Sequence, residues 1–329
     1  MTRRVTVEAA SWRLVAPFAI ARDVRTHVDT VVVRLEQDGA VGRGECRPYA
    51  RYAESVDSVK SEIAGIAAAL EAGMDRAALQ GALPAGAARN AVDCALWDLE
   101  AKRSGTPVWH LAGLDAPRPV LTAYTISLDA EDRMAAAAAE AVAAGRTLLK
   151  LKLTGEGDLG RVRAVRAAAP DARLIVDANE AWRPEDVGPW AAAMGEAGVA
   201  MIEQPLPAGE DAALDGLESP VVLCADESCH DRASLDGLVG RYGMINIKLD
   251  KTGGLTEALA LKAAAEARGL RIMVGCMMAG SLAMAPAMLV AQGAEIVDLD
   301  GPLWLAEDHD PPLRAEGAML SPADPALWG

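Results

Sequence analysis

Three acidic residues in the middle of the chain, Asp177, Glu203 and Asp226, each come directly after a short apolar run. An acidic residue after a strand is commonly a helix N-cap, and this alternative stays open for each of them. Three carboxylates at equal height on consecutive strands would repel one another unless a divalent cation lay between them. All-oxygen ligation suits Mg²⁺ better than zinc, and the 4 histidines form no HxH or HExxH pattern. The sequence therefore predicts a Mg²⁺ site.

Lysines accompany this acidic set. Lys150 and Lys152 lie two residues apart in an apolar run, so their side chains share one face of a strand, and Lys248 ends a later run. The alternative is that Lys150 and Lys152 extend to solvent. Two amines on opposite sides of a metal-anchored substrate could remove a proton from one face of a carbon and return one to the other face. For this chemistry each amine must be partly neutral, and we expect Mg²⁺ and neighbouring lysines to lower its pKa.

The composition limits the possible partners and the compartment. The chain has 329 residues, 51% of them hydrophobic, and a net charge of −15, which excludes overall disorder and makes nucleic acid or an anionic membrane a poor partner. The 5 cysteines form no CxxC pair, and no signal peptide is recognised, so we expect a cytoplasmic protein. Residues 272–294 are uncharged, but Gly275, Gly280 and Pro286 favour a buried strand–loop–helix over a membrane span.

The order of the predicted elements places these residues. Up to about residue 115, strands at 5–12 and 27–35 precede helices, the strongest at 85–103 and stopped by Gly105 and Pro107. Eight β-rich runs then follow with Ala-rich stretches between them, and they begin near residues 122, 148, 173, 200, 221, 244, 271 and 295. This repeat predicts a parallel (β/α)8-type barrel. The alternative, an open doubly wound sheet, is weakened because no GxGxxG follows a strand.

A barrel would bring the polar residues together. Functional groups of such barrels come from the C-terminal ends of the strands. The second and sixth strands are four apart in a ring of eight, so Lys152 and Lys248 should face each other across the mouth. The three acidic residues would fill the arc between them.

The chain resembles the enolase superfamily, its muconate-lactonizing subgroup, and within that the L-Ala-D/L-Glu type of dipeptide epimerase. The resemblance covers nearly the whole chain. It rests on KxK at Lys150, DAN, IEQP and ADES at the three acids, NIKLDKTGG from Asn246, DLDGP from Asp298 and GECRPYARYAES from Gly44. It implies an α/β fold: a (β/α)7β modified TIM barrel, residues 119–304, with an N-terminal α+β capping domain, residues 1–118, completed by the tail 305–329.

The resemblance also implies roles for the predicted site. Asp177, Glu203 and Asp226 would bind Mg²⁺. Lys152 and Lys248 would be the epimerising bases, a pattern known with metal-held ene-diolates in this superfamily, and Lys150 would stabilise the substrate carboxylate.

The substrate is predicted from two further motifs. Asp298 and Asp300 alternate around Leu299, so both should project inward beside the metal site. They could be a second metal pair or a structural cap, but we interpret them as a receptor for the free ammonium group of a dipeptide, the role that DxD has in the family. This interpretation counts against related enzymes whose substrates lack an ammonium group.

The cap should bind the other end of the substrate. Arg25, in the predicted first cap loop with Arg22, matches best the arginine that pairs with the glutamate side chain; the alternative is a solvated surface arginine. Thr125 on the first barrel strand is a weaker candidate for a hydrogen bond to substrate. The turn 276–281 lacks the acidic residue that many relatives carry there, so this wall should be small and apolar.

The resulting hypothesis is a Mg²⁺-dependent isomerase that converts L-Ala-D-Glu to L-Ala-L-Glu, a murein-type dipeptide, by a two-lysine proton transfer through a stabilised enolate. The alternatives are an N-acyl amino acid racemase, an o-succinylbenzoate synthase or a muconate cycloisomerase. A metal-dependent barrel hydrolase and a non-catalytic barrel that binds acidic peptides are further alternatives. The missing HxH weakens the hydrolase, and the paired lysines weaken the binding module. A homo-oligomer is left open.

Overall fold

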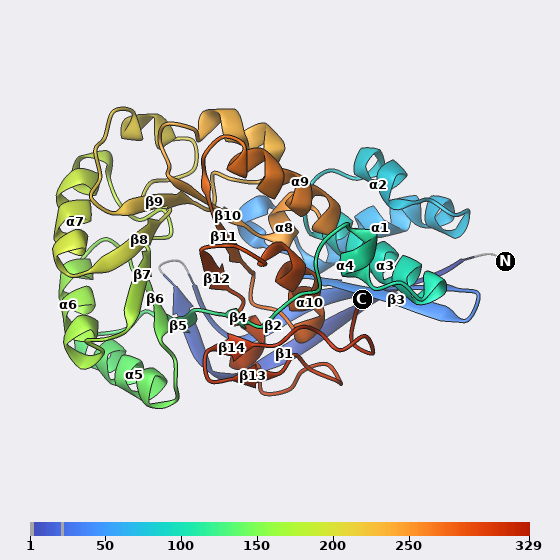
Figure 1. Cartoon of the computed structure of the whole chain (residues 1–329), viewed down its shortest axis with the longest axis horizontal. Coiled ribbons are helices and arrows are strands. Elements are labelled where there is room, and N and C mark those ends of the chain that lie inside the picture. The colour runs from blue at the N-terminus through green and yellow to red at the C-terminus, as the bar shows by residue number, and fades with distance from the viewer. Residues whose placement is uncertain (1–2, 21–22) are drawn as a thin grey trace.

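The computed structural model describes residues 3–20 and 23–329. An antiparallel sheet begins the chain, in the order β1-β2-β3, and helices follow it (Figure 1). The strands are β1 (Arg4–Ile20), β2 (Asp23–Gln37) and β3 (Ala40–Cys46), and the helices are η1 (Ala50–Tyr52), α1 (Val56–Glu71), α2 (Arg76–Ala82), α3 (Ala87–Ser104) and α4 (Val108–Leu111).

The β1–β2 hairpin is longer than the predicted strands. β1 continues well beyond residues 5–12, with a register shift between Arg13 and Phe18. Because β1 is an edge strand, this irregularity and Pro17 leave the rest of the sheet intact. Arg25 therefore lies on β2, paired with Phe18, and the prediction that it lies in a loop is wrong. The long hairpin carries this side chain from the cap to the barrel mouth.

Helix α3 packs closely on the sheet, as the predicted helix 85–103 required. A Cβ atom on Gly42 would lie 2.2 Å from the carbonyl oxygen of Ala95, and one on Gly44 would lie 2.1 Å from that of Ala91. Only glycine permits this approach. The helix ends at Gly105, whose φ of 69° is left-handed.

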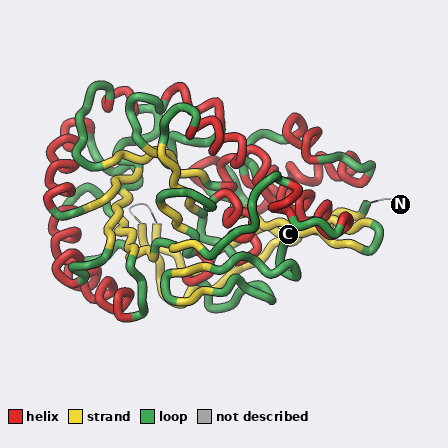
Figure 2. The backbone as a smooth tube through the Cα atoms, viewed as in Figure 1, coloured by secondary structure: helices red, strands yellow, loops and turns green. Residues whose placement is uncertain are grey.

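Eight parallel strands form the second sheet, in the order β12-β11-β10-β9-β8-β7-β6-β5 (Figures 1 and 2). They are β5 (Tyr124–Ile126), β6 (Leu148–Lys152), β7 (Arg173–Asp177), β8 (Val199–Glu203), β9 (Val222–Ala225), β10 (Met244–Ile247), β11 (Arg271–Gly275) and β12 (Ile296–Asp298). The backbone N–H of Ala123 donates to the oxygen of Val297 at 2.7 Å, which links the first strand to the last.

The barrel interior is packed rather than open. One buried layer takes a residue from each strand or the residue before it: Ala123, Leu148, Ile175, Met201, Cys224, Met244, Met273 and Ile296. Because this layer fills the lower barrel, polar side chains can gather only nearer the C-terminal ends of the strands. The predicted fold class, a (β/α)7β barrel with an α+β cap, is confirmed.

The strand–helix repeat is less regular than predicted. The connecting helices are α5 (Glu131–Ala143), α6 (Asp158–Ala168), α7 (Pro184–Glu196), α8 (Leu249–Thr252), α9 (Leu255–Glu266) and α10 (Ser281–Val290), with η4 (Gly301–Trp304) after β12. After β8 and β9 only 3-10 turns form, η2 (Asp211–Leu214) and η3 (Arg232–Gly237). Between β8 and β9, Pro205, Pro207, Gly209 and Gly216 explain this, because they disfavour a continuous α-helix.

The C-terminal segment returns to the cap. A small sheet joins β4 (Val120–Leu121), β14 (Met319–Leu320) and β13 (Ala315–Glu316). Farther on, the indole of Trp328 donates to the Cys94 oxygen at 3.0 Å, and the Gly329 N–H donates to Asp98 Oδ1 at 2.8 Å. Both acceptors lie on α3, so the end of the chain is held against the cap.

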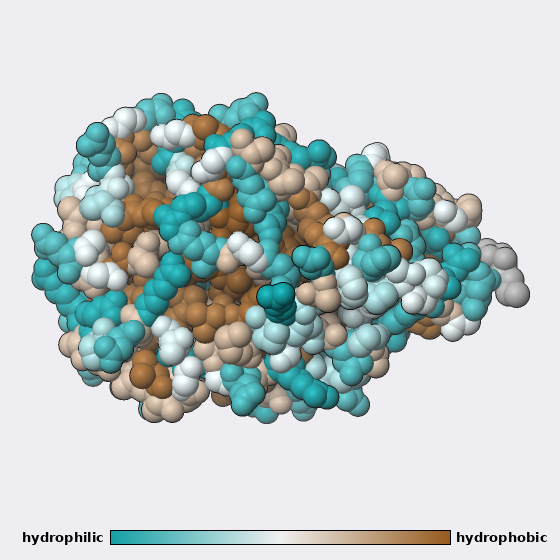
Figure 3. Space-filling model, in the orientation of Figure 1, coloured by the Kyte–Doolittle hydropathy of each residue, from teal (hydrophilic) through white to brown (hydrophobic). Residues whose placement is uncertain are grey.

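The uncharged stretch 272–294 forms most of β11, a loop and α10, as predicted. All ten residues of α10 are buried. Among residues 3–20 and 23–329, no helix is long and apolar enough to cross a bilayer. The face in Figure 3 is largely hydrophilic around its rim, and hydrophobic residues show mainly in the hollow over the barrel.

Candidate active site

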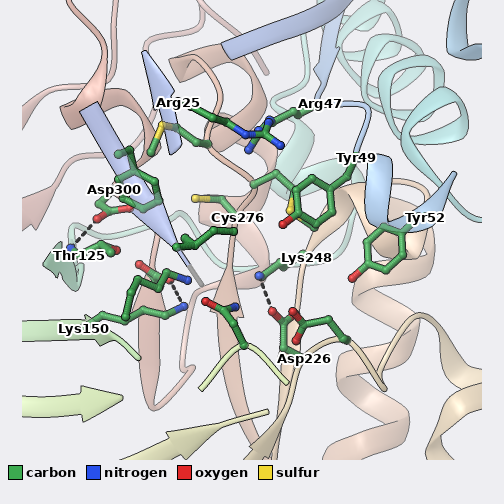
Figure 4. A pocket seen from close by; sticks show the side chains of 18 residues that line it. Arg25, Arg47, Tyr49, Tyr52, Thr125, Lys150, Asp226, Lys248, Cys276 and Asp300 are labelled. Carbon is green, nitrogen blue, oxygen red and sulfur yellow. Dashed lines mark hydrogen bonds and ion pairs between the residues drawn. The ribbon is translucent and has the colours of Figure 1, made fainter. Parts of the chain in front are cut away.

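A pocket lies between the cap and the C-terminal ends of the barrel strands (Figure 4). The barrel contributes the lysines and carboxylates at its floor. The cap contributes Arg25, Arg47, Tyr49 and Tyr52. Arg22, the other predicted arginine, lies outside the described residues.

The three predicted metal-binding carboxylates lie on adjacent strands. Asp177 and Glu203 are direct register partners on β7 and β8, and Asp226 follows β9. Each is at most 2% exposed. Burial and the carboxylate of Asp177 raise the pKa of Glu203 to about 7. Burial also opposes ionisation of Asp177, but Lys152 and Lys150 outweigh it and lower its pKa to about 2. The floor therefore concentrates negative charge that needs cations.

Lysines from opposite strands supply part of that positive charge. Lys152 Nζ lies 2.6 Å from Asp177 Oδ2, and Lys248 Nζ lies 2.6 Å from Asp226 Oδ2. Their strands, β6 and β10, are four apart in the sheet of eight. The structure thus places one amine on each side of the carboxylates, as the sequence predicted.

Lys150 lies at the centre of the charged floor. Its ammonium group is 2.7 Å from Glu203 Oε2 and 2.7 Å from Asp298 Oδ2. Burial opposes the charge of Lys150 and of Lys248, but the surrounding carboxylates outweigh burial and raise both pKa values well above normal. Lys150 itself lowers the pKa of Lys248, but the contacting carboxylates have the larger effect. The predicted lowering concerns the site with Mg²⁺ bound and stays a prediction.

The same three carboxylates are the candidate ligands of a metal ion. Across residues 3–20 and 23–329, no three acidic, histidine or cysteine side chains already surround a common point as a metal-binding group. Glu203 Oε2 is buried and its cationic contact is the Lys150 ammonium group at 2.7 Å. Three buried carboxylates on adjacent strands form an all-oxygen donor set that fits a hard divalent cation.

Asp298 and Asp300 both line the pocket, as predicted. Asp300 Oδ2 accepts from the backbone N–H of Thr125 at 2.7 Å and from the Trp304 indole at 3.4 Å. Burial and the Asp298 carboxylate raise the pKa of Asp300 to about 6. Asp298 Oδ1 is buried and accepts no hydrogen bond from any described residue. An acceptor of this kind can bind a further N–H donor. Thr125 also lines the pocket, next to Asp300.

Comparisons with known proteins place the whole chain. Residues 2–113 match the family described as mandelate racemase / muconate lactonizing enzyme, N-terminal domain, and residues 133–325 match the enolase C-terminal domain-like family. The chain belongs to the enolase superfamily. The resemblance inferred from the sequence motifs is confirmed.

Two curated superfamily members with similar sequences are named for activities on glutamate derivatives. The chain is 50% identical to the L-Ala-D/L-Glu epimerase of Escherichia coli K12, over 95% of this chain and 97% of that protein. It is 43% identical to an N-acetyl-D-glutamate racemase from a Pseudoalteromonas species, over 91% of this chain and 95% of that protein.

Solved superfamily structures include ligand complexes. An Agrobacterium tumefaciens protein with homology to dipeptide epimerases, bound to sodium and L-Ala-L-Glu, superposes with a TM-score of 0.96. Its identity is 52%, and the match covers 99% of this chain and 100% of that one. A dipeptide epimerase from Enterococcus faecalis, complexed with Mg and L-Leu-L-Tyr, has a TM-score of 0.91 and 29% identity, with 98% of both chains covered.

The structure adds two residues to this superfamily site that sequence reasoning did not select. Lys251 is 1% exposed, and its ammonium group contacts Asp226 Oδ1 at 2.5 Å and the Asn246 carbonyl oxygen at 3.0 Å. The Asn246 amide donates to Glu203 Oε1 at 2.7 Å. Both residues orient proposed metal ligands. Their signal was present in the NIKLDKTGG motif, which begins with Asn246 and has a second lysine three residues after Lys248.

The upper wall of the pocket is apolar, as predicted from the turn 276–281, but two methionines make it larger than the small wall expected. Cys276, Met277 and Met278 line it, and none of them carries charge. On the other side, Arg25 Cζ lies 5.8 Å from the centre of the Tyr49 ring. The pocket therefore has an apolar side on the barrel and a cationic, aromatic side on the cap.

Proposed function

We propose that this chain is a Mg²⁺-dependent isomerase that epimerises dipeptides at the second residue, with L-Ala-D-Glu and L-Ala-L-Glu as its preferred pair. The observation that carries the proposal is the placement of Lys152 and Lys248 on opposite strands, with carboxylates between them. A solved relative that is 52% identical to this chain is bound to L-Ala-L-Glu, which supports the same substrate here.

In this proposal the two lysines serve opposite faces of the substrate α-carbon. One neutral amine removes the α-proton, and the ammonium group on the other side returns a proton to the opposite face. Lys150 places its positive charge beside the substrate carboxylate, where negative charge develops as the proton leaves. Burial excludes water from the pocket floor and strengthens this interaction.

Asp177, Glu203 and Asp226 would hold Mg²⁺. Their oxygens form an all-carboxylate donor set, and each now contacts a lysine ammonium group. The same oxygens that contact the lysine ammonium groups are the ones that would face the ion. Bound Mg²⁺ supplies positive charge that stabilises the anion formed when the α-proton leaves.

The second candidate function is racemisation of N-acetylglutamate. It is supported by a relative named for that activity, to which this chain is 43% identical. The two substrates share the glutamate moiety but differ at the amino end. N-acetylglutamate has no ammonium group, so it would leave Asp298 Oδ1 without a charged donor. This unpartnered buried oxygen favours the dipeptide.

The test is proton exchange in D₂O with Mg²⁺. We expect L-Ala-D-Glu and L-Ala-L-Glu each to gain one deuterium at the glutamate α-carbon and to interconvert. Mass spectrometry measures the deuterium, and chiral chromatography measures the interconversion. N-acetylglutamate should react with a kcat/KM at least about thirtyfold lower, since it lacks one buried charge pair. Faster reaction of N-acetylglutamate would favour the second candidate, and no exchange in either substrate would exclude both.

Asp298→Asn tests the ammonium receptor. We expect kcat/KM for L-Ala-L-Glu to fall about thirtyfold or more, because one partner of a buried charge pair is lost. Asp298 also contacts Lys150, so some loss should occur with every substrate. The ratio of L-Ala-L-Glu to N-acetyl-L-glutamate activity isolates the ammonium effect and should fall about thirtyfold. Equal losses on both substrates would show that Asp298 acts only through Lys150. Asp236→Asn, at an aspartate with 88% side-chain exposure, is the control.

We further propose the domain division 1–118 and 119–304, with the tail 305–329 completing the cap. The contacts of Trp328 and Gly329 with α3 support this division. A cytoplasmic location is supported by five cysteines that are all unpaired, and the charge of −15 argues against nucleic-acid and anionic-membrane partners.

A further inference from the structure

Arg47 is a pocket residue whose charge the proposed reaction does not yet use. It follows β3 and is 6% exposed. Its backbone N–H donates to Asp250 Oδ1 at 3.0 Å, which fixes the main chain at the edge of the pocket. Its guanidinium group is among the groups that line the pocket. Arg47 Nη2 is buried and has no hydrogen-bond acceptor among residues 3–20 and 23–329.

A buried guanidinium group with an unsatisfied N–H donor would be stabilised by a bound anion. Arginine stays protonated at any physiological pH, so it cannot lower the cost of burial by losing its charge. Its Cζ lies 5.5 Å from the centre of the Tyr49 ring. This contact uses the ring face and gives Nη2 no hydrogen-bond acceptor. The missing component is an acceptor with negative charge.

A second cation is close to the same ring. Arg25 Cζ lies 5.8 Å from the Tyr49 ring centre, and both arginines line the same pocket. Figure 4 shows their guanidinium groups reaching the same upper part of the cavity, away from the carboxylates at the floor. Both guanidinium groups are therefore placed to reach one anion in this part of the pocket.

We propose that Arg47 determines specificity by binding the distal carboxylate of the substrate's second residue together with Arg25. Its planar fork suits a carboxylate, which can accept two parallel hydrogen bonds. The inference rests on the proposed function and adds a second cationic contact to it. The site therefore selects acidic over neutral side chains at the epimerised position.

Arg47→Gln tests this role with two matched substrates, L-Ala-L-Glu and L-Ala-L-Gln. The two have nearly the same shape, but only the first has the distal charge. We expect the kcat/KM ratio of Glu to Gln dipeptide to fall at least about thirtyfold in the variant. Arg47→Lys, which keeps the charge but not the fork, should lie between wild type and Arg47→Gln. Arg34→Gln, at an exposed arginine of the same sheet, should leave the ratio unchanged.

Retained turnover of L-Ala-L-Gln shows that Arg47→Gln is folded. If both dipeptides lose activity equally, or if the ratio does not change, the specificity role is excluded. Calorimetric binding of both dipeptides to the wild-type protein separates this proposal from the proposed function. Selective binding of L-Ala-L-Glu that depends on Arg47, without any proton exchange, would keep the anion site and exclude the epimerase. Epimerisation that does not depend on Arg47 would support the proposed function and exclude the anion site at Arg47.

Discussion

Replacing Lys248 by Met is expected to lower kcat for epimerisation by about 10²–10⁴-fold, the usual contribution of a positioned acid–base group. Lys152→Met should have a similar effect, because the two amines serve different faces of one carbon. Asp226 keeps its contact with Lys251 when Lys248 is lost, so the fold should survive. We would measure kcat by chiral chromatography and the melting temperature by calorimetry.

The isotopic pattern makes this prediction specific. A protein that retains one base can still exchange the α-proton of one isomer with D₂O, while it cannot convert that isomer to the other. The two variants should therefore exchange opposite isomers, L-Ala-L-Glu in one and L-Ala-D-Glu in the other. Lys102→Met, at a lysine paired with Asp98 in the cap, is the control and should retain full activity. Full epimerisation by either site variant would contradict the two-base assignment.

Removal of divalent metal is expected to abolish turnover, and Mg²⁺ should restore it. Glu203→Gln should raise the Mg²⁺ concentration for half-maximal activity at least about 100-fold. Even substitution of residues that only orient metal ligands often lowers metal affinity by about 10–100-fold. The substitution removes one of three carboxylates and keeps the shape of the side chain. Activity as a function of Mg²⁺ concentration is the first measurement.

A direct binding measurement separates metal affinity from catalysis. Titration with Mn²⁺, followed by electron paramagnetic resonance, should show tight binding to the wild type and weak binding to Glu203→Gln. Glu100→Gln, at a glutamate paired with Arg76 in the cap, should bind like the wild type. Undiminished turnover after exhaustive chelation would contradict the metal assignment and the mechanism with it.

Much of the fold and of the pocket floor was predictable from local patterns. A strand side chain alternates between two faces, so residues that end parallel apolar runs must point to a common edge once the runs pair. Asp177 and Glu203 are register partners for this reason, and Lys150 and Lys152 point inward from β6. The regular spacing of the runs likewise predicted eight parallel strands.

Contacts between distant segments were not predictable in the same way. The Lys150–Asp298 ion pair joins residues 148 apart in sequence, and Asp298 is one of the carboxylates that raise the pKa of Lys150. The contacting carboxylates raise the pKa of Lys150 and of Lys248, because a lysine pKa depends on the charges around it. The sequence shows those charges but not their distances.

The sequence by itself determined which side chains meet at the barrel mouth, because strand alternation and the order of parallel strands follow from local patterns. Only the tertiary structure decided what the cap contributes. It placed Arg25 on a strand rather than in a loop, and it buried Arg47 in the same pocket without an acceptor for Nη2. The physical reason is that these burials and charge contacts arise where the cap packs on the barrel, and no periodicity along the chain records that contact.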